Sequence, residues 1–308
     1  MNKKVWLLIS AFISIHSFSQ PFTLEVKVQN QPENKIILGT VSGDRFTPVD
    51  SLPAQNNSVR FKFPPNAVPG MYRLVFGQTL YAKIMNDPPQ QIDFVFNNEH
   101  IIFETDFNTP EDSLQVILSE ENRIWFEFRG KEKQFQKNLN ELEAEIGYYQ
   151  QAAQPAEAAV RIEKYNRLQK ERDHYLLATA EKNPERLAAK WIKLYREPFL
   201  DGNLTPQERK ELFQKEYFTN VDFNDETLIL SSVGSDRVFR YLTSYNQKGW
   251  TKKQLEQDYC KAVDVVFAGT SQNPKVAQFI RDYVIQGFEI LKMDTVIEYI
   301  RNQYPDGR

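Results

Sequence analysis

The sequence predicts an α+β fold: an antiparallel β-sandwich, immunoglobulin- or transthyretin-like, followed by an all-helical domain. Three observations support this prediction. Ten of the 16 prolines lie at or before Pro110. Residues 22–107 form short β-branched and aromatic runs, divided by turn residues at about ten-residue spacing. From Ser119 onward, apolar residues recur at three-, four- and seven-residue steps, which is typical of amphipathic helices.

The first residues have the pattern of a secretory signal peptide. Lys3 and Lys4 precede an apolar run from Val5 to Ile15, and the small residues of Ser17–Gln20 follow it. The run is shorter than the roughly 20 residues needed to span a bilayer. We therefore expect residues 1–20 to be removed, Pro21 to begin the folded chain, and the protein to be exported, periplasmic or secreted.

The sandwich domain is predicted over residues 21–118. Eight strands are predicted within residues 22–107, with a hairpin turn at Ser42–Arg45. No helix is expected between them. The predicted strands span residues 22–28, 35–41, 46–52, 59–63, 71–76, 80–85, 92–96 and 101–107.

Residues 109–118 allow two interpretations. Thr109–Asp112 resembles a helix start, with a hydroxyl cap, a proline in the first turn and acidic residues beside it. Alternatively this segment is a turn, Ser113–Leu118 is a last strand, and the first helix starts at Ser119. The alternation of Leu114, Val116 and Leu118 favours the strand.

The helical domain is predicted over residues 119–308 and begins with a long helical hairpin. Its two helices are separated by a break at residues 150–158, which contain Pro155. Capping patterns mark the starts of six later helices. They lie at Asn183-Pro184, Thr205–Glu208, Asn224–Glu226, Thr251, Asn273-Pro274 and Asp294.

The charge balance argues against nucleic acid as a partner. Residues 1–20 hold two lysines and no acidic residue, so the mature chain has 36 basic and 41 acidic residues and a net charge near −5. Phosphate binding requires clustered Lys and Arg. No further apolar run reaches membrane-spanning length, so no transmembrane segment is expected in the mature chain.

Few residues can carry catalytic or metal chemistry. Cys260 is the single cysteine, so neither an intramolecular disulfide nor a Cys-x-x-Cys pair can form, and a half-buried packing role on a helix is expected. After cleavage only His100 and His174 remain, both expected at the surface. Their spacing matches no metal site or catalytic triad. The sequence therefore nominates no catalytic, cofactor-binding or metal-binding residue, and no enzyme activity or cofactor is expected.

Several stretches nevertheless suggest relatives. They are Ile36–Gly39 with Val49–Leu52, Pro69–Leu74, Ile92–Phe96, Leu118–Asn122, Val221–Leu228 and Tyr241–Tyr245. In these stretches the chain resembles the uncharacterised β-sandwich and helical segment that precede the thioredoxin domain in thiol-disulfide oxidoreductases of Gram-negative cell envelopes. The resemblance implies an accessory region without the redox domain, and no catalytic residue can be transferred to this chain.

The leading hypothesis is a non-catalytic, exported cell-envelope protein with a binding or assembly role. Its expected partner is another envelope protein, which the resemblance suggests could have a thioredoxin fold. One alternative is an accessory subunit or a truncated form of a thiol-disulfide oxidoreductase. Another is a glycan-binding envelope protein that uses the sandwich.

Overall fold

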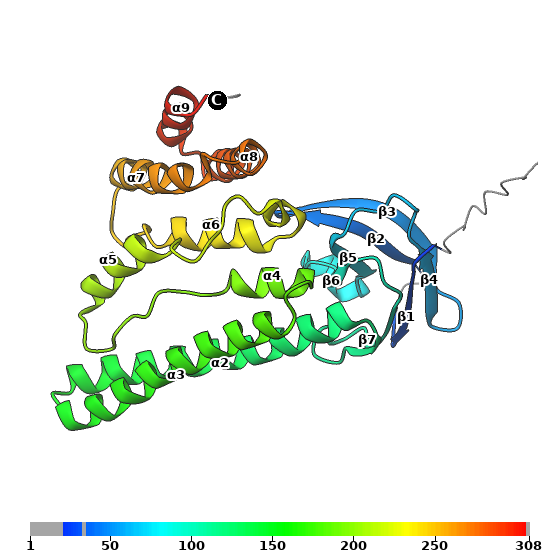
Figure 1. Cartoon of the computed structure of the whole chain (residues 1–308), viewed down its shortest axis with the longest axis horizontal. Coiled ribbons are helices and arrows are strands. Elements are labelled where there is room, and N and C mark those ends of the chain that lie inside the picture. The colour runs from blue at the N-terminus through cyan, green and yellow to red at the C-terminus, as the bar shows by residue number, and fades with distance from the viewer. Residues whose placement is uncertain (1–20, 33–34, 306–308) are drawn as a thin grey trace, which may run out of the picture.

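The computed structural model describes residues 21–32 and 35–305, so the predicted signal peptide lies outside the described residues. The strands gather at one end of the molecule, and the helices stack beside them (Figure 1). The predicted α+β order, strands first and helices after, is confirmed.

Two four-stranded sheets form the sandwich. One has the order β4-β1-β7-β8 and the other β3-β2-β5-β6. The strands are β1 (Thr23–Gln29), β2 (Lys35–Ser42), β3 (Arg45–Pro53), β4 (Ser58–Lys62), β5 (Gly70–Gly77), β6 (Gln90–Phe96), β7 (Ile101–Asp106) and β8 (Gln115–Leu118). Alternate side chains of both sheets meet in one core, where the rings of Phe94 and Phe103 lie 5.7 Å apart.

One pair of neighbouring strands in the sandwich is parallel rather than antiparallel. β1 and β7 pair in parallel, with Leu24 opposite Ile101 and Val28 opposite Thr105. The chain passes through the whole second sheet between these two strands. A connection of that length can return the chain in either direction, whereas a tight hairpin enforces antiparallel pairing.

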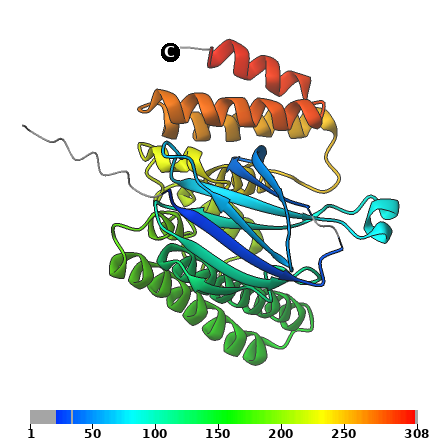
Figure 2. The same cartoon turned by 90° about the vertical axis from the view of Figure 1, so that its right-hand side faces the viewer.

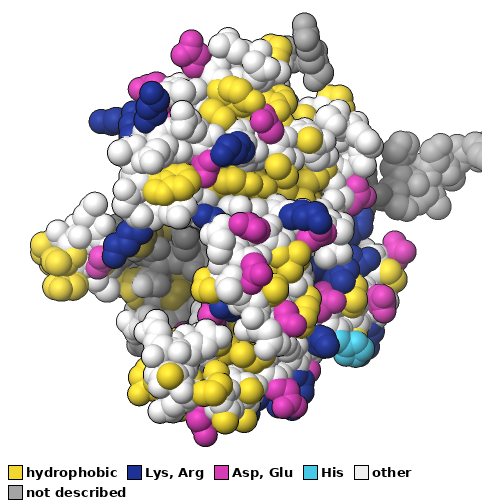
Figure 3. Space-filling model, turned by 90° about the vertical axis from the view of Figure 1, so that its left-hand side faces the viewer, with side chains coloured by type: hydrophobic (Ala, Val, Ile, Leu, Met, Phe, Trp, Pro, Cys, Tyr) yellow, Lys and Arg dark blue, Asp and Glu magenta, His cyan; other side chains and the backbone are white. Residues whose placement is uncertain are grey.

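The predicted strand at residues 80–85 is also wrong, because these residues form a helix, α1 (Leu80–Met85). The Thr79 hydroxyl accepts a hydrogen bond from the Ala82 N–H, and Asn86 ends the helix in the left-handed conformation. The helix projects from the sandwich (Figure 2) and forms the largely hydrophobic lobe at the left of Figure 3. Leu80, Tyr81, Ile84 and Met85 are all exposed there.

Ser119 lies between the last strand and the first long helix and caps that helix. β8 ends at Leu118, and α2 (Glu120–Gln151) begins two residues later. The Ser119 hydroxyl accepts a hydrogen bond from the Asn122 N–H, and Glu99 accepts bonds from the N–H groups of Glu120 and Glu121. Glu99 also places a negative charge at the helix N-terminus, which the helix dipole favours.

The predicted hairpin is confirmed, but its break covers only residues 152–154 because Pro155 opens the second helix. The helices α2 and α3 (Pro155–Lys182) run side by side along the lower edge of Figure 1. The remaining helices are α4 (Leu187–Lys193), α5 (Pro206–Glu216), η1 (Glu226–Leu230), α6 (Val233–Thr243), α7 (Lys252–Thr270), α8 (Pro274–Ile290) and α9 (Asp294–Gln303). The predicted caps at Thr205, Thr251 and Asn273 are confirmed.

Two helix starts differ from the prediction. Asn183 closes α3, so α4 begins four residues later, at Leu187. Asp225 caps only the short helix η1, and Ser231 separates it from α6 because its backbone is extended. The run from residue 224 to 242 is therefore two helices rather than one.

The helices cover the outer face of the sheet that contains β6. Val41, Met71 and Val95 leave the sandwich core and join the helical core, which contains Trp125 and Trp191. The N–H of Gly43 also donates a hydrogen bond to the Ser231 carbonyl. Strands and helices thus share a buried apolar interface. No helix among residues 21–32 and 35–305 is long and apolar enough to cross a membrane.

Candidate ligand-binding groove

The segment from Tyr195 to Thr205, which we call the strap, links α4 to α5 and crosses α3. The Gln169 side chain pairs with the strap backbone in both directions: it accepts a hydrogen bond from the Leu200 N–H and donates one to the Leu200 carbonyl, each at 2.9 Å. Asn166 accepts a bond from the Gly202 N–H. These side-chain amides supply hydrogen-bond partners that the strap backbone would otherwise lack. The strap is thereby fixed to α3.

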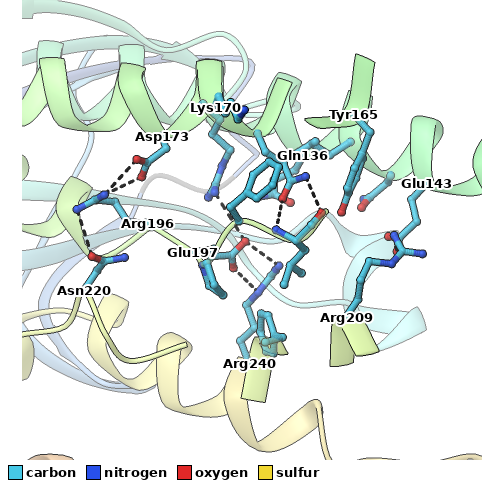
Figure 4. A pocket seen from close by; sticks show the side chains of 18 of the residues that line it. Gln136, Glu143, Tyr165, Lys170, Asp173, Arg196, Glu197, Arg209, Asn220 and Arg240 are labelled. Atoms are coloured by element: carbon cyan, nitrogen blue, oxygen red, sulfur yellow. Dashed lines mark hydrogen bonds and ion pairs between the residues drawn. The ribbon is translucent and has the colours of Figure 1, made fainter. Parts of the chain in front are cut away.

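Between the strap, the hairpin, α5 and α6 lies a hollow of about 760 Å³, which we call the hairpin groove (Figure 4). This volume lies within the range of ligand pockets, roughly 300–1,000 Å³. Its apolar lining includes Leu139, Leu177, Phe199 and Phe213. Its charged lining comprises Glu143, Lys170, Arg172, Asp173, Arg196, Glu197, Arg209, Lys210 and Arg240.

A buried ion network forms one wall of the groove. Arg172 on α3 makes a two-pronged contact with Glu132 on α2, at 2.9 Å and 2.7 Å, and donates to the Tyr195 carbonyl at 2.8 Å. Burial lowers the pKa of Arg172, but the hydrogen bonds and charge of Glu132 outweigh that effect and leave it above its usual value. The pair thus locks hairpin and strap together.

Glu197 on the strap lies among three arginines. Its carboxylate pairs with Arg240 at 2.7 Å and has Arg172 at 3.7 Å and Arg237 at 3.8 Å. Together with Glu132, the cluster contains three guanidinium groups and two carboxylates, so it holds one positive charge in excess.

Arg237 and Tyr217 form the least satisfied part of this cluster. The Arg237 guanidinium lies 3.9 Å from the centre of the Tyr217 ring and donates to the Tyr217 carbonyl at 2.9 Å. Within the part of the chain that the structure describes, Arg237 Nε and the Tyr217 hydroxyl are buried without a hydrogen-bond partner. Burial lowers the pKa of Arg237 and raises that of Tyr217 to about 12.

The network also borders a second hollow, of about 490 Å³, whose lining includes Arg129, Tyr217 and Arg237. Gln136, Arg172, Glu197 and Arg240 line both hollows and form their common wall. A third hollow, of about 450 Å³, shares Arg129 with the second and reaches the sandwich at Arg73 and Asp93. A chain of recesses therefore runs from the hairpin to the outer face of the β2–β6 sheet.

The chemistry of the ion network at this wall is that of anion binding rather than proton transfer. Arginine stays protonated at all physiological pH values, and a guanidinium offers a planar fork that fits carboxylate or phosphate oxygens. The one phenol in the network, Tyr217, has its pKa raised away from neutrality. The groups at this wall can hold and orient a negative charge but are poorly suited to transfer a proton at neutral pH.

The three residues that the sequence analysis considered for chemistry, Cys260, His100 and His174, lie apart from one another. Cys260 is half-buried on α7 and packs against the helical core, and burial, with Asp264 and Glu256, raises the pKa of its thiol. His100 is exposed and accepts a hydrogen bond from the Thr23 N–H. His174 is exposed on α3, at the groove. Across residues 21–32 and 35–305, no group of three His, Cys, Asp and Glu side chains could hold a metal ion.

The groove residues were missed from the sequence, although one signal marks some of them. Glu132 lies four residues after buried Phe128, Arg172 four before buried Leu176, and Arg237 midway between buried Val233 and Tyr241. Each charged residue therefore occupies the apolar stripe of its helix. Because charged side chains are rarely buried unless paired, a charge at such a position predicts a buried ion pair.

Comparison of this chain with protein-family models, with curated proteins and with solved structures finds no match. The fold and the site are therefore interpreted from their own geometry.

Proposed function

We propose that the chain is a non-catalytic, exported cell-envelope protein that binds a partner protein and holds one of its segments in the hairpin groove. The observation that carries this proposal is the 760 Å³ groove, which is lined by both cations and apolar side chains. Pockets that combine apolar walls with a few placed polar groups are the usual form of a binding site.

The way in which the groove is built also supports binding. Gln169 and Asn166 fix the strap to α3, and the pair of Arg172 and Glu132 fixes α3 to α2. A site formed before the ligand arrives avoids part of the ordering cost of association. Export rests on the pattern of residues 1–20, and a thioredoxin-fold partner rests on the family resemblance.

Photocrosslinking from inside the groove tests this proposal. A photoreactive phenylalanine analogue is placed at Phe199, whose side chain is 42% exposed and lines the groove. The matched control carries the same analogue at Glu298, exposed on α9 at the opposite end of the helical part from the hairpin (Figure 1). Irradiation of living cells should give one defined adduct from position 199 and none from position 298.

The adduct is then mapped by mass spectrometry, and the identified partner is purified and mixed with the purified protein. A thioredoxin-fold partner would favour the accessory-subunit hypothesis over other assembly roles. Equal adducts from both positions, or a purified partner that does not bind, would refute the groove as the binding site. Amino-terminal sequencing of the envelope fraction tests export, because the mature chain should begin at or near Pro21.

A further inference from the structure

The hairpin groove carries an excess of positive charge. Six Lys and Arg side chains line it against three Asp and Glu side chains, in a chain whose formal net charge is −3. The cations are Lys170, Arg172, Arg196, Arg209, Lys210 and Arg240, and the anions are Glu143, Asp173 and Glu197. Positive charge therefore exceeds negative charge at this recess of an acidic protein, which favours a negatively charged ligand.

Two of these cations, Lys170 and Lys210, have no ion pair within the described residues. Arg172 and Arg196 are engaged in two-pronged pairs with Glu132 and Asp173. Lys210, by contrast, has no hydrogen bond or ion pair within the described part of the chain. Lys170 has no ion pair with those residues either, and its ammonium lies 5.2 Å from the centre of the Phe199 ring.

Arg209 adds a buried group that is only partly satisfied. Its side chain is 10% exposed, and Nη1 pairs with Glu143 at 3.1 Å. Among the described residues its Nε is buried without an acceptor. A buried donor without a partner destabilises the free state, so a carboxylate that pairs with this guanidinium would gain a contact that the chain itself does not provide.

The apolar lining narrows the class of ligand. Phe199 is 42% exposed, and Leu139, Leu177 and Phe213 also line the groove. A small inorganic anion could use the cations but would leave these side chains uncovered. A peptide segment in which acidic and apolar side chains alternate could use both, since its extended backbone presents them to opposite or neighbouring walls.

From this arrangement we infer that the hairpin groove binds an acidic, amphipathic peptide segment. Its carboxylates pair with Lys170, Lys210 and Arg209, and its apolar side chains cover Phe199. This inference rests on the proposed binding function and specifies the chemistry of the partner segment.

The test uses a fluorescently labelled hexapeptide of alternating Glu and Leu and measures its binding to the full-length mature protein by anisotropy. The double variant Lys170→Gln/Lys210→Gln should weaken binding by about fivefold or more, because it removes two partly exposed ion pairs. The matched control is Lys131→Gln/Lys164→Gln, which removes two exposed lysines of the same hairpin that lie outside the groove lining. It should stay within about twofold of wild type.

Three further measurements separate the possible outcomes. Raising the salt from about 50 mM to about 500 mM should weaken binding of the Glu-Leu peptide but not that of a Gln-Leu peptide. Equal binding of the two peptides, or an equal loss in the control variant, would overturn the inference. Displacement of the peptide by citrate or inorganic phosphate at equal concentration would show a site for small anions instead.

A failure of this inference can be distinguished from a failure of the proposed function. If crosslinking at Phe199 captures a partner while the acidic peptide does not bind, the partner's charge has been inferred wrongly and the binding role stands. If the peptide binds but no partner is captured, the charge inference stands and the cellular partner is in doubt. Circular dichroism of each variant confirms that the fold is unchanged.

Discussion

Asn122 is the residue whose loss should most clearly separate the sandwich from the helices. β6 is an edge strand, so its outer backbone groups have no neighbouring strand. The Asn122 amide takes that place: Oδ1 accepts from the Val95 N–H at 2.8 Å, and Nδ2 donates to the Val95 carbonyl at 2.7 Å. Asn122 is fully buried, and Nδ2 also donates to the Ser119 hydroxyl.

The perturbation is Asn122→Leu, which keeps the side-chain volume roughly constant and removes the amide. It leaves the N–H and carbonyl of Val95 without partners at a buried interface. Each of these two buried polar groups left without a partner costs about 1–3 kcal/mol, so the free energy of unfolding should fall by about 2–6 kcal/mol. At an m-value of about 3 kcal/mol per molar urea, the midpoint should fall by roughly 1 M.

The assay is urea unfolding of the mature protein, followed by tryptophan fluorescence and by far-ultraviolet circular dichroism. Trp125 and Trp191 lie in the helical core beside the interface, so their fluorescence reports on the loss of the contact. The matched control is Asn138→Leu on the same helix, where the side chain is half-buried and, among the described residues, bonds only to Gln134. Its stability should change by less than about 0.5 kcal/mol.

The reasoning is refuted if Asn122→Leu and Asn138→Leu unfold at the same urea concentration. That result would mean that Val95 finds other partners, such as water, and that the interface is not closed. A fluorescence transition that precedes the circular dichroism transition in Asn122→Leu alone would instead support the assignment, because the helical core would then open before the rest of the chain.

Three further predictions concern buried polar groups. Arg172→Met should lower the free energy of unfolding by about 3–5 kcal/mol because it leaves Glu132 buried and unpaired, whereas Arg172→Met/Glu132→Leu should recover most of the loss. Tyr217→Phe should be neutral or stabilising by about 1 kcal/mol at pH 7, because the buried hydroxyl lacks a partner within the described chain. The folded-state pKa of Tyr217 is raised to about 12. Wild type should therefore lose stability as pH rises from about 10 to about 12, and Tyr217→Phe should lose less. The Cys260 thiol should react with a disulfide reagent more slowly in the native protein than in urea, because its pKa is raised.

Each of these three predictions would be contradicted by a specific result. A double variant of Arg172 and Glu132 that is no more stable than the single one would mean that packing, not charge, holds the hairpin to the strap. Equal alkaline unfolding curves for wild type and Tyr217→Phe would mean that other buried groups control that transition. A native Cys260 as fast as the unfolded thiol would place the side chain in water.

The strands were predictable because their pattern has one physical cause. Leu24, Val26 and Val28 alternate with polar residues since only one face of β1 packs into the sandwich. No such alternation exists in α1, where apolar residues surround a single lysine. Its helix depends on the cap at Thr79 and the left-handed Asn86, features too short-range to give a periodic pattern.

The groove could not be predicted in the same way, because its parts come from α2, α3, the strap, α5 and α6. Sequence spacing places Glu132 and Arg172 on the apolar stripes of their own helices but does not show that the two meet. Their contact depends on how the hairpin folds back. The pairing of Glu197 with Arg240 requires, in addition, the path of the strap across α3.

That path also explains why the groove stays open. Asn166, Gln169 and Asp173 recur at three- and four-residue steps on α3 and hold the strap by its backbone and by Arg196. The strap is held against α3 through these polar groups, and Phe199 on the strap lines the space beside the helix and remains 42% exposed. The cations at that space are therefore positioned before any ligand binds, and substitutions of exposed Lys170 and half-buried Lys210 alter the charge of the site while its framework stays in place.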